Sequence, residues 1–249
     1  MNFSIKMKTA LITGAGKRIG KAIAIRLGAE GANVIVHYNH SRSEAEKVAE
    51  TIRKQGSNAW TIHANLAKPE LASELISRAV EHAGCPIDIL VNNASIFPKS
   101  LLDTFTQDEL FQNININALS PFMITRSFSQ QGRDGVVINM IDAAIVNYES
   151  NHAAYHISKR MLLTLTKMAA LEYAPKVRVN GVAPGLILPP KGKDESYLQG
   201  LAQFNPLNRW GSPDDVADAI VFLATSSFIT GQIIFIDGGR FMRGDANGL

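Results

Sequence analysis

The chain has 249 residues, of which 46% are apolar and 19% charged, and its formal net charge is +3. This composition fits one α/β domain with a sizeable core, and no run of lysine and arginine indicates nucleic-acid binding. The longest apolar runs fall well short of the roughly 18 residues of a membrane span, the start MNFSIKMK is too short and polar for a signal peptide, and the lone Cys85 excludes an internal disulfide, so we expect a cytoplasmic protein.

Short runs rich in valine and isoleucine alternate with longer amphipathic stretches from one end of the chain to the other. Two of these stretches, 21–31 and 43–56, end at glycines, as helices commonly do. The pattern predicts a Rossmann-type, doubly wound parallel sheet with helices on both faces, in one domain over 1–249. The expected strand order is 3-2-1-4-5-6-7, and the seven expected strands are 9–13, 33–38, 59–64, 87–92, 135–141, 177–182 and 232–237.

The stretch TGAGKRIG, residues 13–20, follows the first expected strand and opens the first expected helix. Gly14 and Gly20 would let the backbone approach a pyrophosphate, and the helix amino terminus would supply free N–H groups. The turn also carries Arg18, a charged residue in a place where a phosphate cradle usually has small ones. The motif alone is weak evidence for a dinucleotide.

The second expected strand ends VHYNHSR and has no acid before Glu44. NAD-binding proteins usually place an acid here, which grips the ribose 2′-hydroxyl and repels a 2′-phosphate. We expect Arg18 to lie against this end of the strand and to fork onto a 2′-phosphate, so that NADPH is favoured over NADH. The alternative is a solvated arginine beside a polar loop. The nearby donors or potential cations are His37, Asn39, His40 and Ser41.

A chemical constellation follows the fifth expected strand. Asp142 comes at its end, and the segment YHISK places Lys159 four residues after Tyr155, on one helix face. A neighbouring ammonium stabilises a phenolate, so we expect Lys159 to lower the pKa of Tyr155 and to prepare it as a general acid. The alternatives are a Tyr-x-x-x-Lys pair that only decorates a helix surface, and an Asp142 that caps a helix or pairs with Lys159.

The segment 183–200, APGLILPPKGKDESYLQG, is the longest irregular stretch of the sequence. It is either a mobile lid over a site or an ordinary surface excursion. We expect a substrate loop at about 186–212.

The chain resembles the short-chain dehydrogenase/reductase family in a set of motifs that occur in the same order. These motifs are TGAGKRIG, NNAS (92–95), Asn117 in NINALSPF, YHISK and APG (183–185). The resemblance covers essentially the whole chain. It implies that Tyr155 donates the proton, that Lys159 tunes it and holds the nicotinamide ribose, and that Asn117 supports a proton path. It further implies coenzyme contacts by Gly14, Arg18, Ile19, Gly20, His37, Tyr38, Asn39, His40, Ser41, Asn65, Leu66, Asn93, Ala94, Ser95, Tyr155, Lys159, Pro184 and Gly185.

Three departures from the family pattern resemble its pteridine reductase branch: Arg18 replaces a glycine, Asp142 replaces the catalytic serine, and NNAS is followed by Ile96 and Phe97. This resemblance implies that Asp142 and Tyr155 act together on the proton and that Phe97 sandwiches a pterin against the nicotinamide, with Ser95 also at the substrate. Reduction of a C=N bond needs hydride at carbon and a proton at nitrogen, which a carboxyl group beside a phenol can relay.

We therefore expect an NADPH-dependent reductase of a pterin or a similar planar C=N substrate. The alternatives are a carbonyl or 3-oxoacyl thioester reductase and, less favoured, a dinucleotide sensor without turnover. Without the resemblance, Phe97 is equally well a rim aromatic, and His152 and His156 are polar neighbours. No His or Cys spacing indicates a metal. The resemblance also implies a homotetramer built on helices around 107–129 and 153–173.

Overall fold

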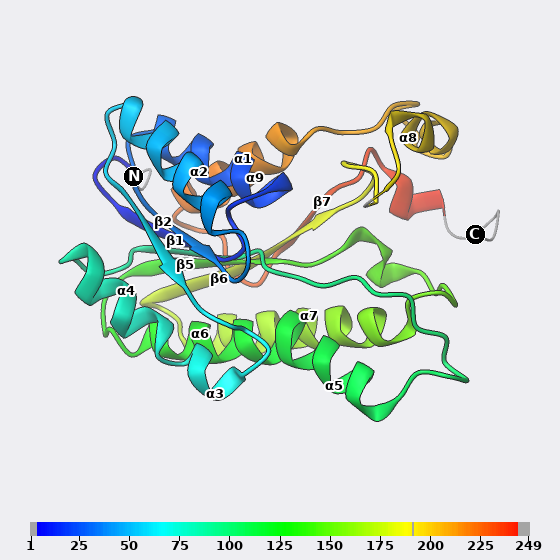
Figure 1. The fold of residues 1–249 in the computed structure, drawn as a ribbon, viewed down its shortest axis with the longest axis horizontal. Coiled ribbons are helices and arrows are strands. Elements are labelled where there is room, and N and C mark those ends of the chain that lie inside the picture. The colour runs from blue at the N-terminus through cyan, green and yellow to red at the C-terminus, as the bar shows by residue number, and fades with distance from the viewer. Residues whose placement is uncertain (1–3, 191, 244–249) are drawn as a thin grey trace.

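The computed structural model describes residues 4–190 and 192–243, and its centre is one parallel sheet (Figure 1). The strand order is β3-β2-β1-β4-β5-β6-β7, as the sequence predicts. Every predicted strand is present, with ends that differ from the prediction by at most two residues. The strands are β1 Thr9–Ile12, β2 Asn33–Tyr38, β3 Ala59–His63, β4 Ile89–Asn92, β5 Gly135–Met140, β6 Val177–Pro184 and β7 Ile233–Ile236.

The central strands are apolar throughout because helices cover both faces of the sheet. Alternate residues of one strand enter different cores: Ala10 and Ile12 pack on one side, and Leu11 packs on the other. The parallel register places Leu11 beside Ile35 on β2 and Leu90 on β4, so that each layer continues across the sheet. The result is two buried cores that share a single sheet.

Helices α1 (Arg18–Ala29), α2 (Arg42–Lys54) and α9 (Pro213–Thr225) cover one face (Figure 1). The other face carries the longest helix, α7 (Ala153–Glu172). With it lie α3 (Pro69–Ala72), α4 (Leu75–Ala83), α5 (Gln107–Ile114) and α6 (Ser120–Ser129). A π-helical turn, η1 (Asn115–Leu119), joins α5 to α6. Helix α1 begins three residues before the predicted stretch, inside the glycine turn.

The carboxyl ends of the parallel strands meet at one edge of the sheet, where doubly wound proteins bind ligands. Three further elements lie beyond this edge: η2 (Ala143–Val146) after β5, α8 (Glu195–Ala202) after β6 and η3 (Arg240–Arg243) after β7. Figure 1 shows α8 and η3 together at the end of the molecule where the described chain finishes. Among the described residues, no helix combines the length and apolar character of a membrane span.

Candidate active site

The glycine turn connects β1 to α1 and is packed tightly against the segment after β4. The Asn93 side chain donates to the carbonyl oxygens of Thr13 (2.9 Å) and Gly14 (3.2 Å). A Cβ on Gly20 would lie 2.5 Å from Asn93 Nδ2 and from Gly14 O, and Gly14 has a φ of 64°. Glycine is therefore required at both positions. The backbone N–H groups of 16–20 donate to no described residue, which leaves them free for an anion at the start of α1.

Arg18 has a φ of 53°, in the left-handed region that favours glycine. This backbone angle explains why the family pattern has a glycine here. The guanidinium bonds to the loop after β6, where its Nη2 donates to the carbonyl oxygen of Pro189 at 2.8 Å. Arg18 therefore ties the glycine turn to the loop after β6.

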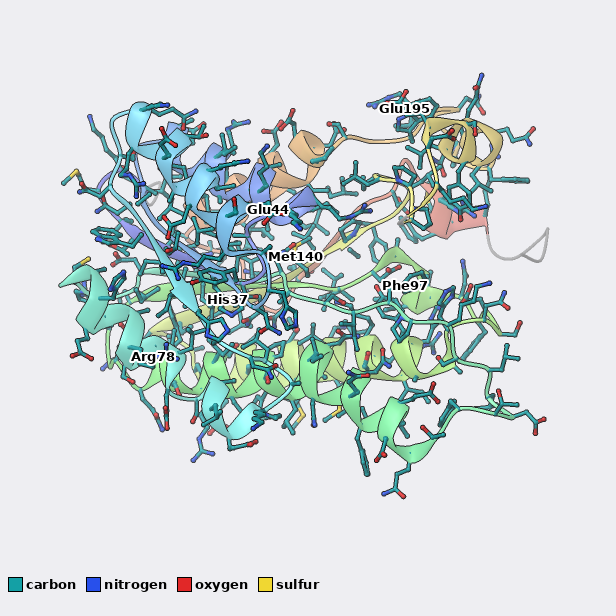
Figure 2. All side chains as sticks on the ribbon, viewed as in Figure 1. His37, Glu44, Arg78, Phe97, Met140 and Glu195 are labelled. Carbon is teal, nitrogen blue, oxygen red and sulfur yellow. The ribbon has the colours of Figure 1, made fainter. Side chains whose placement is uncertain are left out.

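His37 uses its ring nitrogens within the protein and is not a cation. Its ring is buried in β2, where Nδ1 accepts from Gly14 N at 3.0 Å and Nε2 donates to Ala64 O at 3.1 Å. Burial lowers its pKa to about 4, so the ring is neutral and both nitrogens are occupied. His37, labelled in Figure 2, holds the glycine turn in place, whereas Asn39 and Ser41 are half-buried and His40 is exposed.

Lys17 places a cation beside the start of α2, the helix that begins with Arg42. Its Nζ lies 2.7 Å from a carboxylate oxygen of Glu44 in the first turn of that helix. A Cβ on Gly16 would lie 3.1 Å from the Ser41 hydroxyl, so the turn and the loop after β2 are in contact. Lys17 therefore joins the glycine turn to the first turn of α2, and the contact of Arg18 with a 2′-phosphate stays a prediction.

Asp142 and Tyr155 form the chemical centre of the site. Asp142 caps η2 through Oδ1, which accepts from Ala144 N at 2.8 Å, and its Oδ2 accepts from the Tyr155 hydroxyl at 2.5 Å. Tyr155 is buried in the first turn of α7. Oxygen–oxygen distances of about 2.5–2.7 Å are typical of charge-assisted hydrogen bonds. The pair therefore holds one proton between two oxygens at the carboxyl edge of the sheet.

The predicted effect of Lys159 on this phenol is wrong for the structure as it stands. Burial, and then the Asp142 charge, raise the pKa of Tyr155 well above its usual value. Lys159 is itself buried, donates to Met140 O at 2.7 Å, and has its pKa lowered to about 8 by that burial. The desolvation of the phenol and the carboxylate beside it outweigh the ammonium, so Tyr155 retains its proton at neutral pH.

Asn117 lies in the π-helical turn η1 and holds the segment that carries Phe97. Its Oδ1 accepts from Ile96 N (2.9 Å) and from the Ser95 hydroxyl (3.0 Å). Its Nδ2 donates to Ile96 O (3.1 Å) and to Ser158 Oγ (3.0 Å). This buried amide therefore connects residues 95–96 to α7, and it fixes the backbone just before Phe97.

Phe97 lies at the rim of the site, half exposed, in contact with the catalytic helix. Its ring stacks on His152 with 3.8 Å between centroids and meets the Tyr155 ring edge-on at 4.5 Å. His152 Nδ1 donates in turn to Glu149 at 2.6 Å. Figure 2 shows Phe97 toward the end of the molecule that carries Glu195, far from Arg78. The aromatic surface therefore borders Tyr155, and His152 supports it.

Other predicted coenzyme residues take several positions. Ala94 N donates to Thr13 Oγ1, so the segment after β4 borders the glycine turn. Pro184 ends β6, and a Cβ on Gly185 would lie 2.6 Å from Asp237 Cβ. Ile19 and Tyr38 pack against the core, the exposed Asn65 accepts from Ala67 N through its amide oxygen, and Leu66 is buried with its carbonyl bound to Ser120.

The comparison with protein families agrees with this arrangement. A family model described as Enoyl-(Acyl carrier protein) reductase matches residues 14–240. The chain belongs to the short-chain dehydrogenase/reductase family. Among the described residues, no cluster of His, Cys, Asp and Glu could hold a metal ion.

Members of this family with related sequences include reductases of several substrates. Versicolorin reductase stcU of Emericella nidulans is 36% identical, over 96% of this chain and 98% of that protein. The 3-oxoacyl-[acyl-carrier-protein] reductase FabG of Staphylococcus epidermidis is also 36% identical, over 94% and 99%. The structure of FolM Alternative dihydrofolate reductase 1 from Brucella canis, complexed with NADP, has a TM-score of 0.90 and 29% identity, with 98% of both chains covered.

The sequence pattern did not indicate two parts of this short-chain dehydrogenase/reductase site. Lys17 stood in the quoted turn, but only the fold shows that it reaches α2. The second part is a cavity of about 320 Å³ that begins at Asp142 and extends to Arg240 and Arg243 of η3. Its walls come from segments far apart in the sequence, so no local spacing could have predicted it.

Proposed function

We propose that the protein is an NADPH-dependent reductase of the short-chain dehydrogenase/reductase type that reduces a pterin or a similar planar C=N substrate. The observation that carries this proposal is the 2.5 Å hydrogen bond between Asp142 and Tyr155, bordered by the Phe97 ring. A serine in place of Asp142 would suit a carbonyl oxygen, whereas a carboxyl group and a phenol together can hold a proton for a ring nitrogen.

The described residues fit a dinucleotide coenzyme. The turn at Gly14 admits close backbone approach, the start of α1 offers free N–H groups, and Lys17 supplies a cation beside α2. Pro184 and Gly185 would border the nicotinamide, and Lys159 would hold its ribose. When bound, NADPH supplies the hydride, and the related FolM structure carries NADP. We assign the 2′-phosphate to Lys17 and the loop 39–41, and Arg18 to the pyrophosphate side, next to the substrate loop.

The chain's own residues move the proton and place the substrate. For each hydride delivered to carbon, one proton must reach the substrate nitrogen, and the Asp142–Tyr155 pair holds it at Oδ2 and Oη. The raised pKa of Tyr155 keeps that proton on the pair at neutral pH. Phe97 offers a flat surface on which a heterocycle can stack, at the offset that aromatic pairs prefer. Ser95 and Asn117 hold the loop that positions this surface.

Reduction of a carbonyl or of a 3-oxoacyl thioester is the second candidate. It is favoured by the 36% identity to FabG, whose name describes a 3-oxoacyl-[acyl-carrier-protein] reductase. A binding protein without turnover is a weaker candidate, because Tyr155 and Lys159 are both retained.

Turnover of matched substrates separates these functions. Purified protein is mixed with NADPH and either dihydrobiopterin, dihydrofolate or an acetoacetyl thioester, and the loss of NADPH absorbance is followed. We expect turnover of the pterins.

Tyr155→Phe should lower the kcat for the pterins by at least about a hundredfold, the scale of general acid catalysis, with NADPH affinity nearly unchanged. Asp142→Ser should lower pterin turnover more than thioester turnover. Turnover of the thioester alone would reject the pterin assignment, and a protein that binds no NADPH would reject both enzyme functions.

We propose in addition that the protein is a homotetramer in the cytoplasm. The tetramer is supported by exposed apolar side chains on α5 and α7, the helices that the family resemblance assigns to the interface. The cellular location remains a prediction from the single cysteine.

A further inference from the structure

The cavity beside Asp142 is also lined by two arginines, Arg240 and Arg243, for which the described part of the chain supplies no acidic partner. It is lined on one side by Asp142 and the segment after it, and on the other by α8 and η3, which lie side by side in Figure 1. Its volume of about 320 Å³ is in the range of small-molecule sites. A substrate whose reducible ring lies at Asp142 can therefore extend toward η3.

The two guanidiniums are available to a ligand. Neither Arg240 nor Arg243 forms an ion pair with a described residue. Arg240 is half-buried, with its guanidinium carbon 6.0 Å from the centre of the Phe204 ring. Arg243 is exposed and uses Nη1 to donate to Gln203 O at 3.1 Å, which leaves its other donors free.

The acids of the same cavity already have partners. Asp142 accepts from Tyr155 and from Ala144 N, and Glu149 accepts from His152. Asp237 accepts from the backbone N–H groups of Gly239 and Phe241, which holds η3 in place. The carboxylates of the cavity are thus held by hydrogen bonds within the described chain, whereas Arg240 and Arg243 form no ion pair with a described residue.

We propose that Arg240 and Arg243 form a subsite for an anionic tail of the substrate. Guanidinium groups bind carboxylates and phosphates through charge-assisted, often bidentate hydrogen bonds. This inference rests on the proposed function for the identity of the tail: with a pterin ring at Phe97, the tail is a carboxylate, as in the glutamyl part of a folate. The same subsite would take a phosphate if the substrate were a coenzyme A thioester.

Pairs of substrates that differ in the tail test the subsite. The first pair is dihydrofolate and dihydrobiopterin, and the second is acetoacetyl-coenzyme A and acetoacetyl-N-acetylcysteamine, which lacks the phosphates. In the double variant Arg240→Gln/Arg243→Gln, we expect the KM of the anionic member of the productive pair to rise about tenfold, the scale of one charge-assisted contact. The KM of the neutral member should change less than twofold.

A control variant and a binding measurement complete the test. Arg126→Gln removes the same charge from an exposed position on α6 and should leave both members of each pair unchanged. Calorimetry in the presence of NADP+ measures the affinities of folic acid and biopterin without turnover. The double variant should weaken the binding of folic acid and leave that of biopterin nearly unchanged. If neither pterin is reduced but acetoacetyl-coenzyme A shows the tail effect, the pterin assignment fails and the subsite stands. If the double variant changes the KM of the anionic and the neutral member equally in both pairs, the subsite is overturned, whichever substrate is reduced.

Discussion

At Lys159, burial disfavours the positive charge of the side chain. Its ammonium is almost fully buried in α7, and its pKa is lowered from 10.5 to about 8 by desolvation. In the unfolded chain the same lysine would keep its ordinary pKa. Between pH 8 and 10.5 this lysine therefore binds more protons in the unfolded state than in the folded state, and its own contribution to the stability of the protein becomes more favourable as pH rises through that window.

We predict that Lys159→Met removes this pH dependence. Relative to the variant, the wild-type free energy of unfolding should increase by up to about 3 kcal/mol as pH rises from 8 to 10.5, because a shift of one pKa unit corresponds to about 1.4 kcal/mol. The measurement is the thermal midpoint of both proteins at several pH values across the window. Lys21→Met, which removes an exposed lysine of α1, is the control and should run parallel to wild type. Parallel curves for Lys159→Met as well would show that the ammonium is not desolvated.

The residues of the site differ in how far the sequence could predict them. Asp142, Tyr155 and Lys159 could be named because a strand end and an i+4 spacing place them together, and they do lie together. The protonation state of the Tyr155 phenol could not be predicted from the sequence, because it depends on burial and on the distance to Asp142. His37 lies in a run of buried strand residues, which was the available signal that its ring is enclosed rather than exposed to a ligand.

At the scale of elements, the connection between the glycine turn and the loop after β6 depends on Arg18. The left-handed backbone of Arg18 is unfavourable for a residue with a Cβ by about 1–2 kcal/mol. The guanidinium offsets this cost by bonding Pro189 O, which joins two loops at the same edge of the sheet. Strand order could be predicted because period and burial are local patterns, but the direction of this side chain follows from a backbone angle that no pattern of residue types shows.

We predict that Arg18→Gly loosens the loop without destabilising the fold. The thermal midpoint should not fall, since glycine adopts the left-handed angle freely, although it also gains entropy in the unfolded chain. Loss of one hydrogen bond of about 1 kcal/mol should speed exchange of the amides of 186–188, which precede Pro189, about fivefold, measured by hydrogen-exchange mass spectrometry.

Arg18→Asn separates the two effects of that change. Asparagine tolerates the left-handed region but cannot reach Pro189, so it should reproduce the faster exchange of the loop. Exchange at the wild-type rate in both variants would mean that the bond to Pro189 does not hold the loop.

At the scale of the whole molecule, one face of the helical layer is unusually apolar. Ile157, Met168 and Leu171 of α7 are 40%, 60% and 84% exposed, and Phe111 of the neighbouring α5 is 47% exposed. Positions 157, 161, 164, 168 and 171 follow the period of an α-helix, so their side chains form one stripe along the outside of α7, apolar except at Thr164. Contiguous apolar stripes of this kind mark protein–protein contacts.

The occupant of this stripe is expected to be α7 of a second copy, because α5 and α7 carry the interface in the homotetramer that the family resemblance implies. We predict that the wild-type protein elutes as a tetramer, by size-exclusion chromatography with light scattering. Met168→Glu/Leu171→Glu would bring like charges from two copies together in an apolar contact, which costs several kcal/mol, and should leave dimers or monomers.

A matched change elsewhere distinguishes a specific interface from a general effect of added charge. Met7→Glu places a carboxylate on an equally exposed apolar residue, 72% accessible, in the turn before β1 and away from α7. This variant should keep the wild-type mass. A monomeric wild type, or a double variant that remains a tetramer, would place the contact on another face. Because α7 also carries Tyr155 and Lys159, dissociation should lower the thermal midpoint of the reductase together with its mass, since the helix would lose its outer support.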